Sequence, residues 1–236
     1  MNLIKNNWNK KEYKDFINYL FSIKEEKYKL FQQKIIPNKN IIGIRTNILK
    51  KIAKEIYKGN YQEFINNIEN TYYEENILYG LILTNIKDIN TLIPYLNKYI
   101  KIIDNWASCD LTIYNLKIVK NNKDIFFNYI INNIDNDYTY TKRFCYVLLL
   151  NYFIEEKYLN TIFDLSTIKT NDYYVNMSIA WLISICYIKY KKETLEYIKS
   201  NKLNSITYNK TIQKIIESKQ ITNNEKIEFK KLKNLY

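Results

Sequence analysis

The segment DNWASCD, residues 104–110, places an indole and a carboxylate four residues apart in a stretch of helical character. Positions i and i+4 share one face of an α-helix, so Trp106 and Asp110 are expected to face the same space. Two other uncommon residues recur at similar intervals: Arg143 follows Trp106 by 37 positions, and Trp181 follows Arg143 by 38. This interval is typical of helical-hairpin repeats. It predicts that these residues occupy equivalent places in successive repeats and line one concave surface.

The composition shows which residues carry information. The chain has 236 residues, of which 47% are hydrophobic, so it can bury a substantial core and is not generally disordered. Heavy use of Ile, Asn, Lys and Tyr is typical of drift in an AT-rich genome, so single residues of these types say little. The rare types are Arg45, Arg143, Trp8, Trp106, Trp181, Gly43, Gly59, Gly80, Pro37 and Pro94.

The charge balance indicates the class of partner. Lys and Arg number 36 against 24 Asp and Glu, which gives a formal charge of +12 and favours a polyanion such as nucleic acid. The alternative interpretation is a solvated surface on which lysine accumulated by drift.

Several classes of site are excluded by composition. The chain has no His, which removes His-dependent catalytic triads and metal sites. Its three widely spaced cysteines, Cys109, Cys145 and Cys186, are typical of buried thiols in a reducing compartment. No apolar leader or membrane-length run occurs. We therefore expect a cytoplasmic, monomeric protein that uses no metal or cofactor and no membrane.

Helical periodicity dominates the chain, and no Asn-Gly or Asp-Gly hairpin turn occurs. Apolar residues at i, i+3, i+4, i+7 and i+8 from Tyr13 predict a first amphipathic helix. The expected all-α fold is a single domain over residues 1–236, a HEAT-like helical-repeat solenoid with a concave basic groove. Further helices are expected at 25–36, 48–56, 61–70, 73–85, 90–99, 105–120, 123–133, 139–153, 156–165, 172–190, 192–200, 207–219 and 222–233.

A second candidate site lies at the start of the helix expected after Gly43. Thr46 is a suitable N-cap residue, and the free amides and positive dipole end of the helix would suit a phosphate. Arg45 and Lys50 would add positive charge. The alternative interpretation is a buried turn with an ordinary cap.

The residues of the first segment suit one kind of reaction. A purine alkylated at N3 or N7 is cationic, so cleavage of its glycosidic bond moves positive charge to the deoxyribose. The carboxylate of Asp110 could stabilise that charge and orient a water molecule. The indoles of Trp106 and Trp181 would attract the cation, and Arg143 would bind a phosphate. The alternative is a pair of core indoles and a solvated carboxylate.

At these residues the sequence resembles the AlkD family of HEAT-like DNA glycosylases for alkylpurines. The resemblance runs from about Tyr13 to Ser218. Its segments are IIGIRTNILKKIAKEI, IDNWASCD, KRFCYVLLLNYF, YYVNMSIAWLISICYIKY and TYNKTIQKIIES.

The resemblance implies a role for each matching residue. Asp110 matches the catalytic aspartate, Trp106 and Trp181 match indoles that hold the sugar of the lesion, and Arg143 matches an arginine that grips DNA. It also implies double-stranded DNA as the partner and excision without extrusion of the base.

One position departs from the family pattern. The second N-terminal helix of the active glycosylases carries an aromatic residue about nine positions before the glycine, where this chain has Lys34. Pro37 is expected to end that helix. The sequence also resembles a family branch with a reduced N-terminal helical pair, which implies binding of DNA without excision of the usual substrates.

Three functions therefore follow from the sequence. The first is excision of 3-methyladenine and 7-methylguanine by a DNA repair glycosylase. The second is non-catalytic binding of damaged or branched DNA. The third is a helical-repeat adaptor that binds another protein through its indoles.

Overall fold

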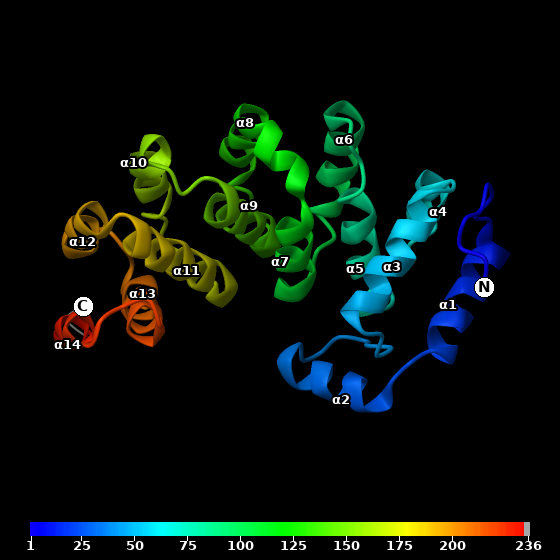
Figure 1. Ribbon diagram of the computed structural model, residues 1–236, viewed down its shortest axis with the longest axis horizontal. Helices are drawn as coiled ribbons and strands as arrows, with labels where there is room; N and C mark the ends of the chain where they lie inside the picture. Colours follow the sequence, from blue (N-terminus) through cyan, green and yellow to red (C-terminus); the bar gives the residue numbers. More distant parts are fainter. Residues whose placement is uncertain (234–236) are drawn as a thin grey trace. The chain divides into compact units, whose positions relative to one another are not determined.

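The structure is a computed structural model that describes residues 1–233, all of whose regular elements are helices (Figure 1). This confirms the all-α helical-repeat fold. The helices are α1 (Lys10–Ser22), α2 (Glu26–Ile35), α3 (Thr46–Tyr57), α4 (Tyr61–Asn66), α5 (Tyr73–Leu83), α6 (Ile89–Tyr99), α7 (Trp106–Asn115), η1 (Lys117–Asn121), α8 (Lys123–Asn133), α9 (Thr139–Tyr152), α10 (Glu156–Leu165), α11 (Tyr173–Lys189), α12 (Lys191–Lys199), α13 (Ser205–Glu217) and α14 (Asn223–Leu232).

The chain divides into two compact units, Met1–Ile118 and Val119–Tyr236. In the first unit α3 packs on α5 and α5 packs on α7, so these helices form consecutive members of one layer. Helix α4 packs on α3, and α6 packs on α5. Every residue of α5 is buried, which makes α5 the central helix of this unit. The single domain expected from sequence stays a prediction.

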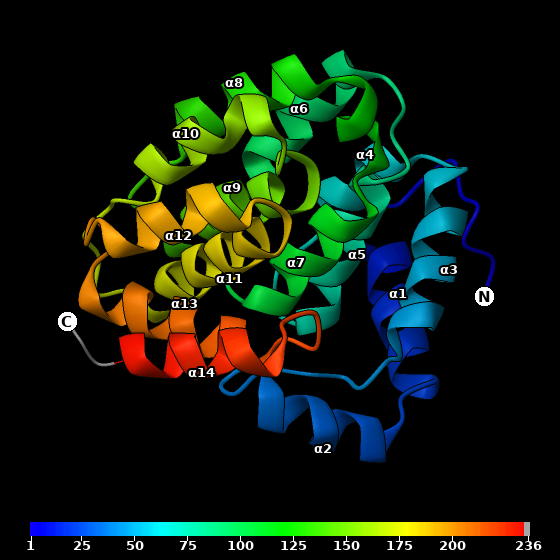
Figure 2. The same cartoon turned by 60° about the vertical axis from the view of Figure 1, so that its left-hand side comes forward.

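The second unit repeats the same arrangement. Helices α9, α11 and α13 pack side by side in one layer, with α8, α12 and α14 packed on α9, α11 and α13. Helix α10 is tied to this assembly because the Tyr146 and Tyr197 hydroxyls donate to its Leu165 and Phe163 carbonyls. Figures 1 and 2 show α8, α10 and α12 following one another on the side opposite α13.

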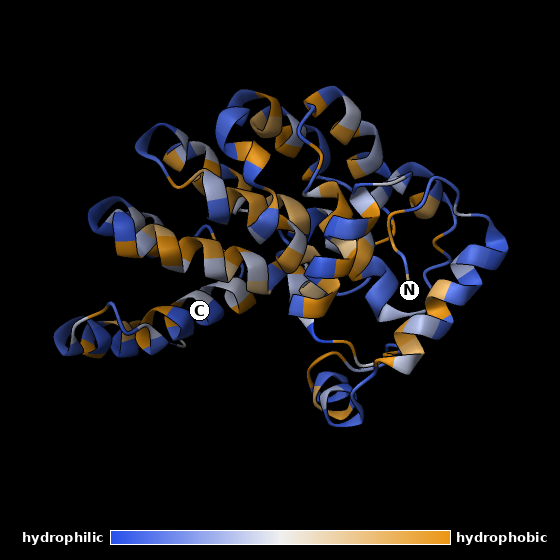
Figure 3. Ribbon diagram, turned by 45° about the vertical axis from the view of Figure 1, so that its right-hand side comes forward, coloured by the Kyte–Doolittle hydropathy of each residue, from blue (hydrophilic) through white to orange (hydrophobic). Residues whose placement is uncertain are grey.

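The apolar pattern explains this packing. Figure 3 shows hydrophobic residues concentrated where helices of a unit face one another, and hydrophilic residues on the outward faces. Burial of these faces is the main favourable contribution to folding. Within residues 1–233, no helix combines the length and apolar character needed to cross a membrane.

Two expected helices are shorter than predicted. The helix expected at 61–70 ends at Asn66, and the helix expected at 105–120 ends at Asn115, after which Leu116 is non-helical and η1 begins. Leu116 and Val119 are both fully buried. The non-helical residue Leu116 and the 3₁₀ segment after it therefore both contribute apolar side chains to the core.

A close approach between α5 and α7 occurs at Gly80. A Cβ at this position would lie 1.9 Å from the Thr112 Oγ1 and 2.5 Å from the Tyr99 hydroxyl oxygen. These two oxygens are hydrogen-bonded at 2.8 Å, and the Tyr99 hydroxyl also donates to the Ser108 carbonyl. The missing side chain therefore lets α7 approach α5 within a buried polar cluster.

We predict that Gly80→Ala lowers the free energy of unfolding by about 1–3 kcal/mol, because the added methyl group overpacks this contact. Urea denaturation measures the change. A double-mutant cycle with Thr112→Ala supplies the control, since removal of the Thr112 hydroxyl should recover part of the loss. Equal losses from Gly80→Ala in both backgrounds would contradict the proposed contact.

Candidate functional site

The start of α7 is fixed by its N-cap. The Asn105 side chain accepts a hydrogen bond from the Ser108 amide at 2.9 Å and donates to the Ser108 hydroxyl, also at 2.9 Å. Asn105 and Ser108 are buried, so this cap is shielded from water. The first helical residue is consequently Trp106, and the orientation of the following turn is set.

An adjoining stripe of α7 carries the predicted pair. Ser108, Cys109, Thr112 and Ile113 are the buried residues of the helix. Trp106 and Asp110 are half-buried and border this buried face, and Tyr114 continues their row with 62% of its surface exposed. The structure therefore brings Trp106 and Asp110 together on one partly open stripe, as the sequence predicted.

Tyr114 was not identified from the sequence. It lies four residues after Asp110, so the same helical spacing could have found it. The chain contains 24 tyrosines, however, and a single one gave no signal against that background. The Lys117 ammonium lies 4.5 Å from the centroid of the Tyr114 ring, which adds a cation to this end of the stripe.

The second N-terminal helix contacts the indole. The Trp106 Nε1–H donates to the Ile35 carbonyl at 3.3 Å, at the C-terminal end of α2. Helix α2 ends before Pro37 as predicted, and its exposed Lys34 lies in the last turn. Trp106 therefore holds the end of the helix in which this chain departs from the family pattern.

The second unit contains the other two predicted residues. Arg143, on α9, is 6% exposed, and its Nη1 donates to the Tyr174 carbonyl at 3.1 Å in the first turn of α11. Trp181, on α11, is half-buried, and the Lys214 ammonium of α13 lies 5.9 Å from its ring centroid. The two residues thus occupy adjacent helices, each beside a neighbouring element that fixes it.

Tyrosines gather near the N-terminal ends of α9 and α11. The rings of Tyr140 and Tyr174 are 5.4 Å apart, and Tyr173 and Tyr174 meet edge to face at 5.3 Å. Tyr138 and Tyr173 remain 60% and 56% exposed. Exposed aromatic rings of this kind are suited to contacts with sugars and bases. Because tyrosine is so frequent in this chain, this cluster could not be recognised from the sequence either.

The expectation that Trp106, Arg143 and Trp181 occupy equivalent repeat positions is wrong. Helices α7, α9 and α11 begin at 106, 139 and 173, so the helical repeat is 33 to 34 residues long. An interval of 37 or 38 residues exceeds that repeat by about one helical turn. Trp106 is the first residue of α7, Arg143 the fifth of α9 and Trp181 the ninth of α11, so each lies one turn further along its helix. That these residues line one surface stays a prediction.

The backbone amides of the segment before α3 donate hydrogen bonds to a carboxylate of the protein itself. The buried Glu74 carboxylate accepts hydrogen bonds from the Ile42, Gly43 and Ile44 amides at 2.9, 2.7 and 3.2 Å. Gly43 makes this possible because its φ of +105° lies in the region that side chains disfavour. These three amides are therefore satisfied by the protein's own carboxylate.

The N-cap of α3 is Arg45, whereas Thr46 was predicted, and no side chain caps the helix. The Arg45 Nε pairs with the Glu25 carboxylate at 2.8 Å and lowers the pKa of that carboxyl through their hydrogen bond. The Thr46 hydroxyl lies 3.4 Å from the Tyr28 hydroxyl, and Lys50 is exposed. DNA binding by Arg45, Thr46 and Lys50 stays a prediction.

The chemistry available to these side chains is limited. Burial raises the pKa of the Cys186 thiol to about 12 and that of Cys145 still further, so neither supplies a thiolate at neutral pH. Within residues 1–233, no three Cys, Asp or Glu side chains are placed to hold a metal ion. Of the predicted site residues, Asp110 is the one that offers negative charge, flanked on its helix by aromatic rings.

The family described as DNA alkylation repair enzyme matches residues 17–215. The chain belongs to the DNA alkylation repair enzyme family. This match covers nearly the same span as the sequence resemblance and confirms it. No curated protein matches the chain. In this DNA alkylation repair enzyme, α7 carries the half-buried aspartate and indole that the sequence singled out.

We predict that Trp106→Phe accelerates amide hydrogen exchange in α2 about five-fold. Phenylalanine keeps an aromatic ring but loses the N–H that holds the Ile35 carbonyl, and such a bond contributes ~1 kcal/mol. Hydrogen exchange followed by mass spectrometry measures the change over residues 26–35. Tyr114→Phe, on the same face of α7, serves as the control, and an unchanged rate in Trp106→Phe would contradict the prediction.

Proposed function

We propose that this DNA alkylation repair enzyme is an N-glycosylase that binds duplex DNA and excises cationic alkylpurines such as 3-methyladenine and 7-methylguanine. The observation that carries the proposal is the half-buried Asp110 carboxylate, one helical turn from the Trp106 indole, on the partly open stripe of α7. The family match supports DNA alkylation repair in general.

The proposed reaction needs no covalent intermediate with the protein. The bond between C1′ and the base nitrogen breaks, and the base leaves with the bonding electrons as a neutral molecule. The deoxyribose becomes an oxocarbenium ion, which a water molecule attacks at C1′. The water loses one proton to Asp110 or to solvent, so the products are a free base, an abasic sugar and a proton.

Asp110 would act mainly through its charge. A fixed carboxylate stabilises the oxocarbenium more than the neutral ground-state sugar, so it lowers the barrier instead of merely improving binding. The Trp106 ring would add attraction for the cation of about 0.5–2 kcal/mol. Because alkylpurines already depurinate spontaneously, a few kcal/mol of stabilisation gives a useful rate.

The second unit supplies two further parts of the proposal. Trp181 would offer another indole to the cationic nucleotide, and Arg143 would bind a backbone phosphate through its guanidinium. The hydrogen bond from the Arg143 Nη1 to the Tyr174 carbonyl supports this role, since it helps to fix the orientation of the planar guanidinium.

We predict that Asp110→Asn slows base release by about 100-fold or more, the scale on which one preorganised electrostatic contact affects a transition state. The measurement is release of methylated purine from a methylated duplex under single-turnover conditions. Asp15→Asn makes the same change at an exposed carboxylate of α1 and should release base at the normal rate. Release at the normal rate by Asp110→Asn would refute the mechanism.

A second candidate function is non-catalytic binding of damaged or branched DNA. It is favoured by Lys34, which stands on α2 where the active glycosylases carry an aromatic residue. The hydrogen bond from the Trp106 indole to the Ile35 carbonyl places the end of this altered helix beside the predicted site. This candidate gives no base release from any methylated duplex while affinity for DNA is retained.

Both candidates require DNA binding that depends on salt. We predict that the logarithm of the association constant for a duplex falls linearly with the logarithm of salt concentration, with a slope of about −0.9 for each phosphate contacted. Fluorescence anisotropy of a labelled duplex between about 50 and 500 mM salt measures it. Absence of binding at the lowest salt concentration would contradict both candidates. The helical-repeat adaptor that binds another protein would then be the remaining function.

A further inference from the structure

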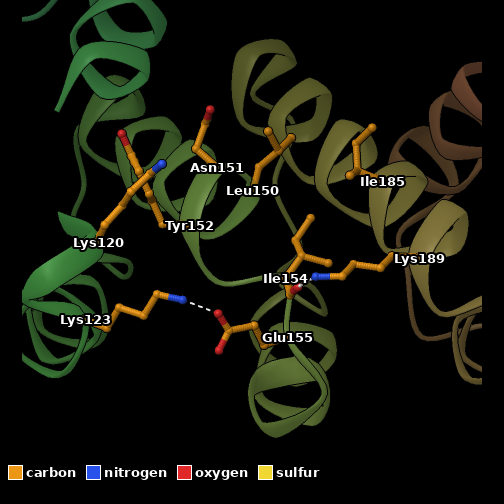
Figure 4. Close-up of a pocket in the computed structure, with 9 residues that line it drawn as sticks. All are labelled: Lys120, Lys123, Leu150, Asn151, Tyr152, Ile154, Glu155, Ile185 and Lys189. Atoms are coloured by element: carbon orange, nitrogen blue, oxygen red, sulfur yellow. Dashed lines mark hydrogen bonds and ion pairs between the residues drawn. The ribbon is translucent and has the colours of Figure 1, made fainter. Parts of the chain in front are cut away.

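The second unit contains a cavity of about 530 Å³ that the proposed reaction does not use (Figure 4). Its walls come from η1, the start of α8, the C-terminal ends of α9 and α11, and the segment that leads into α10. All of these residues belong to Val119–Tyr236, so the cavity is complete within one unit.

Cations dominate the charge of this cavity. Lys120, Lys123 and Lys189 line it together with one carboxylate, Glu155. Figure 4 shows Lys123 and Lys189 approaching from opposite sides, and the Lys123 ammonium forms an ion pair with Glu155. The pKa of Glu155 is lowered, chiefly by its hydrogen bond with Lys123 and to a smaller extent by the charge of Lys189. The surplus positive charge favours an anion.

The position of Lys189 is fixed by the backbone. Its Nζ donates to the Ile154 carbonyl at 2.5 Å, which holds the ammonium over the segment between α9 and α10. An ammonium has three donors, so this bond leaves others available to a ligand. The exposed side chain of Lys189 therefore has less freedom to lose on binding than an unrestrained surface lysine.

The remaining lining is partly apolar. Leu150, Ile154 and Ile185 contribute hydrocarbon surface beside the ammonium groups. A small inorganic anion would gain nothing from that surface. A sugar-phosphate backbone would use both parts, because its phosphate binds ammonium groups while the CH groups of deoxyribose pack on aliphatic side chains.

The cavity and the predicted site residue Trp181 lie along one stripe of α11. Trp181, Ile185 and Lys189 follow one another at intervals of four residues, and all three are at least partly exposed. Eight residues of helix span ~12 Å. Successive phosphates of one DNA strand are ~3.4 Å apart along the duplex axis, so with α11 parallel to that axis this span corresponds to three or four nucleotides.

We propose that this cavity seats a backbone phosphate of bound DNA, three or four nucleotides from the sugar that Trp181 contacts. The inference rests on the proposed function for its DNA partner. It adds a separate anchoring point that sets the register of the strand.

The first test measures duplex affinity of the full chain against salt. Lys189→Met and Lys120→Met should each weaken binding and make the salt slope shallower by about 0.9, so the deficit relative to wild type shrinks about eight-fold between about 50 and 500 mM salt. Lys192→Met, an exposed lysine on α12 outside the cavity, is the matched control and should change neither slope nor affinity beyond a general charge effect. Slopes equal to that of the control would overturn the proposal.

Glu155→Gln provides a change in the opposite direction. Removing the carboxylate releases Lys123 from its ion pair, so duplex affinity at about 50 mM salt should rise several-fold. The gain should exceed the general effect of removing one negative charge, which keeps this arm informative if the lysine variants are unstable. Unchanged or weaker binding by Glu155→Gln would count against the phosphate site.

A methylphosphonate scan locates the phosphate. Single phosphates of a duplex with one 7-methylguanine are replaced by neutral methylphosphonates, and binding is measured with Asp110→Asn so that base release is slow compared with the measurement. A loss of affinity three or four nucleotides from the lesion, absent with Lys189→Met, supports the proposal. A scan that is the same for both proteins, with base release by wild type intact, overturns the cavity site and leaves the glycosylase standing.

Two further outcomes test the phosphate anchor separately from the glycosylase. Failure of base release, together with the predicted lysine and glutamate effects, refutes the glycosylase and retains the phosphate site. Inorganic phosphate is the competitor that distinguishes the source of the anion. If it binds the cavity at millimolar concentration while the lysine variants bind duplex normally, the site takes free phosphate and the DNA anchor is wrong.

Discussion

The contact between α5 and α7 at Gly80 fixes the helix on which the proposed chemistry depends. Because α5 is buried along its whole length, its neighbours must fit its surface closely. A glycine there admits the Thr112 hydroxyl and the Tyr99 ring, and the bonds of Tyr99 to Thr112 and Ser108 then define the rotation of α7. That rotation buries Cys109 and turns Asp110 toward the open face. Core packing, not the site itself, thus determines which side chain of this segment is accessible.

Two carboxylates illustrate how burial decides the role of an anion. Glu74 is completely buried, and three backbone amides satisfy it, so it stabilises the chain turn around Gly43. Because three amides already donate hydrogen bonds to this carboxylate, a ligand would gain little free energy by binding to it. Glu155, in contrast, is partly exposed and holds a lysine at the wall of an open cavity. The first anion is structural, whereas the second offsets part of the positive charge of the cavity.

Helix positions could largely be predicted from the sequence because apolar periodicity is strong and local. It was harder to predict which residues of neighbouring helices lie at corresponding positions. The interval of 37 or 38 residues was interpreted as the repeat, but repeat length is set by helix and loop lengths together, and the helix starts show 33 or 34. The chain's composition caused the other omissions. Tyr114 and the lysines around Glu155 belong to residue types so frequent here that only three-dimensional placement distinguishes them. The rare residues Trp106 and Arg143 were recognisable for the opposite reason.

The half-buried position of Asp110 suits a catalyst that works by charge alone. A fully buried carboxylate would lose most of its hydration before any substrate arrived, which favours the neutral form and removes the charge that the reaction needs. A fully exposed one would interact with the sugar through water, where the attraction at about 4 Å is only ~1 kcal/mol. At a partly open surface the bound DNA itself can displace the remaining water, so in the proposed reaction the local dielectric is already low when the oxocarbenium forms. The attraction would then be strong at the step that creates the positive charge, and that gain requires neither a metal ion nor a nucleophile.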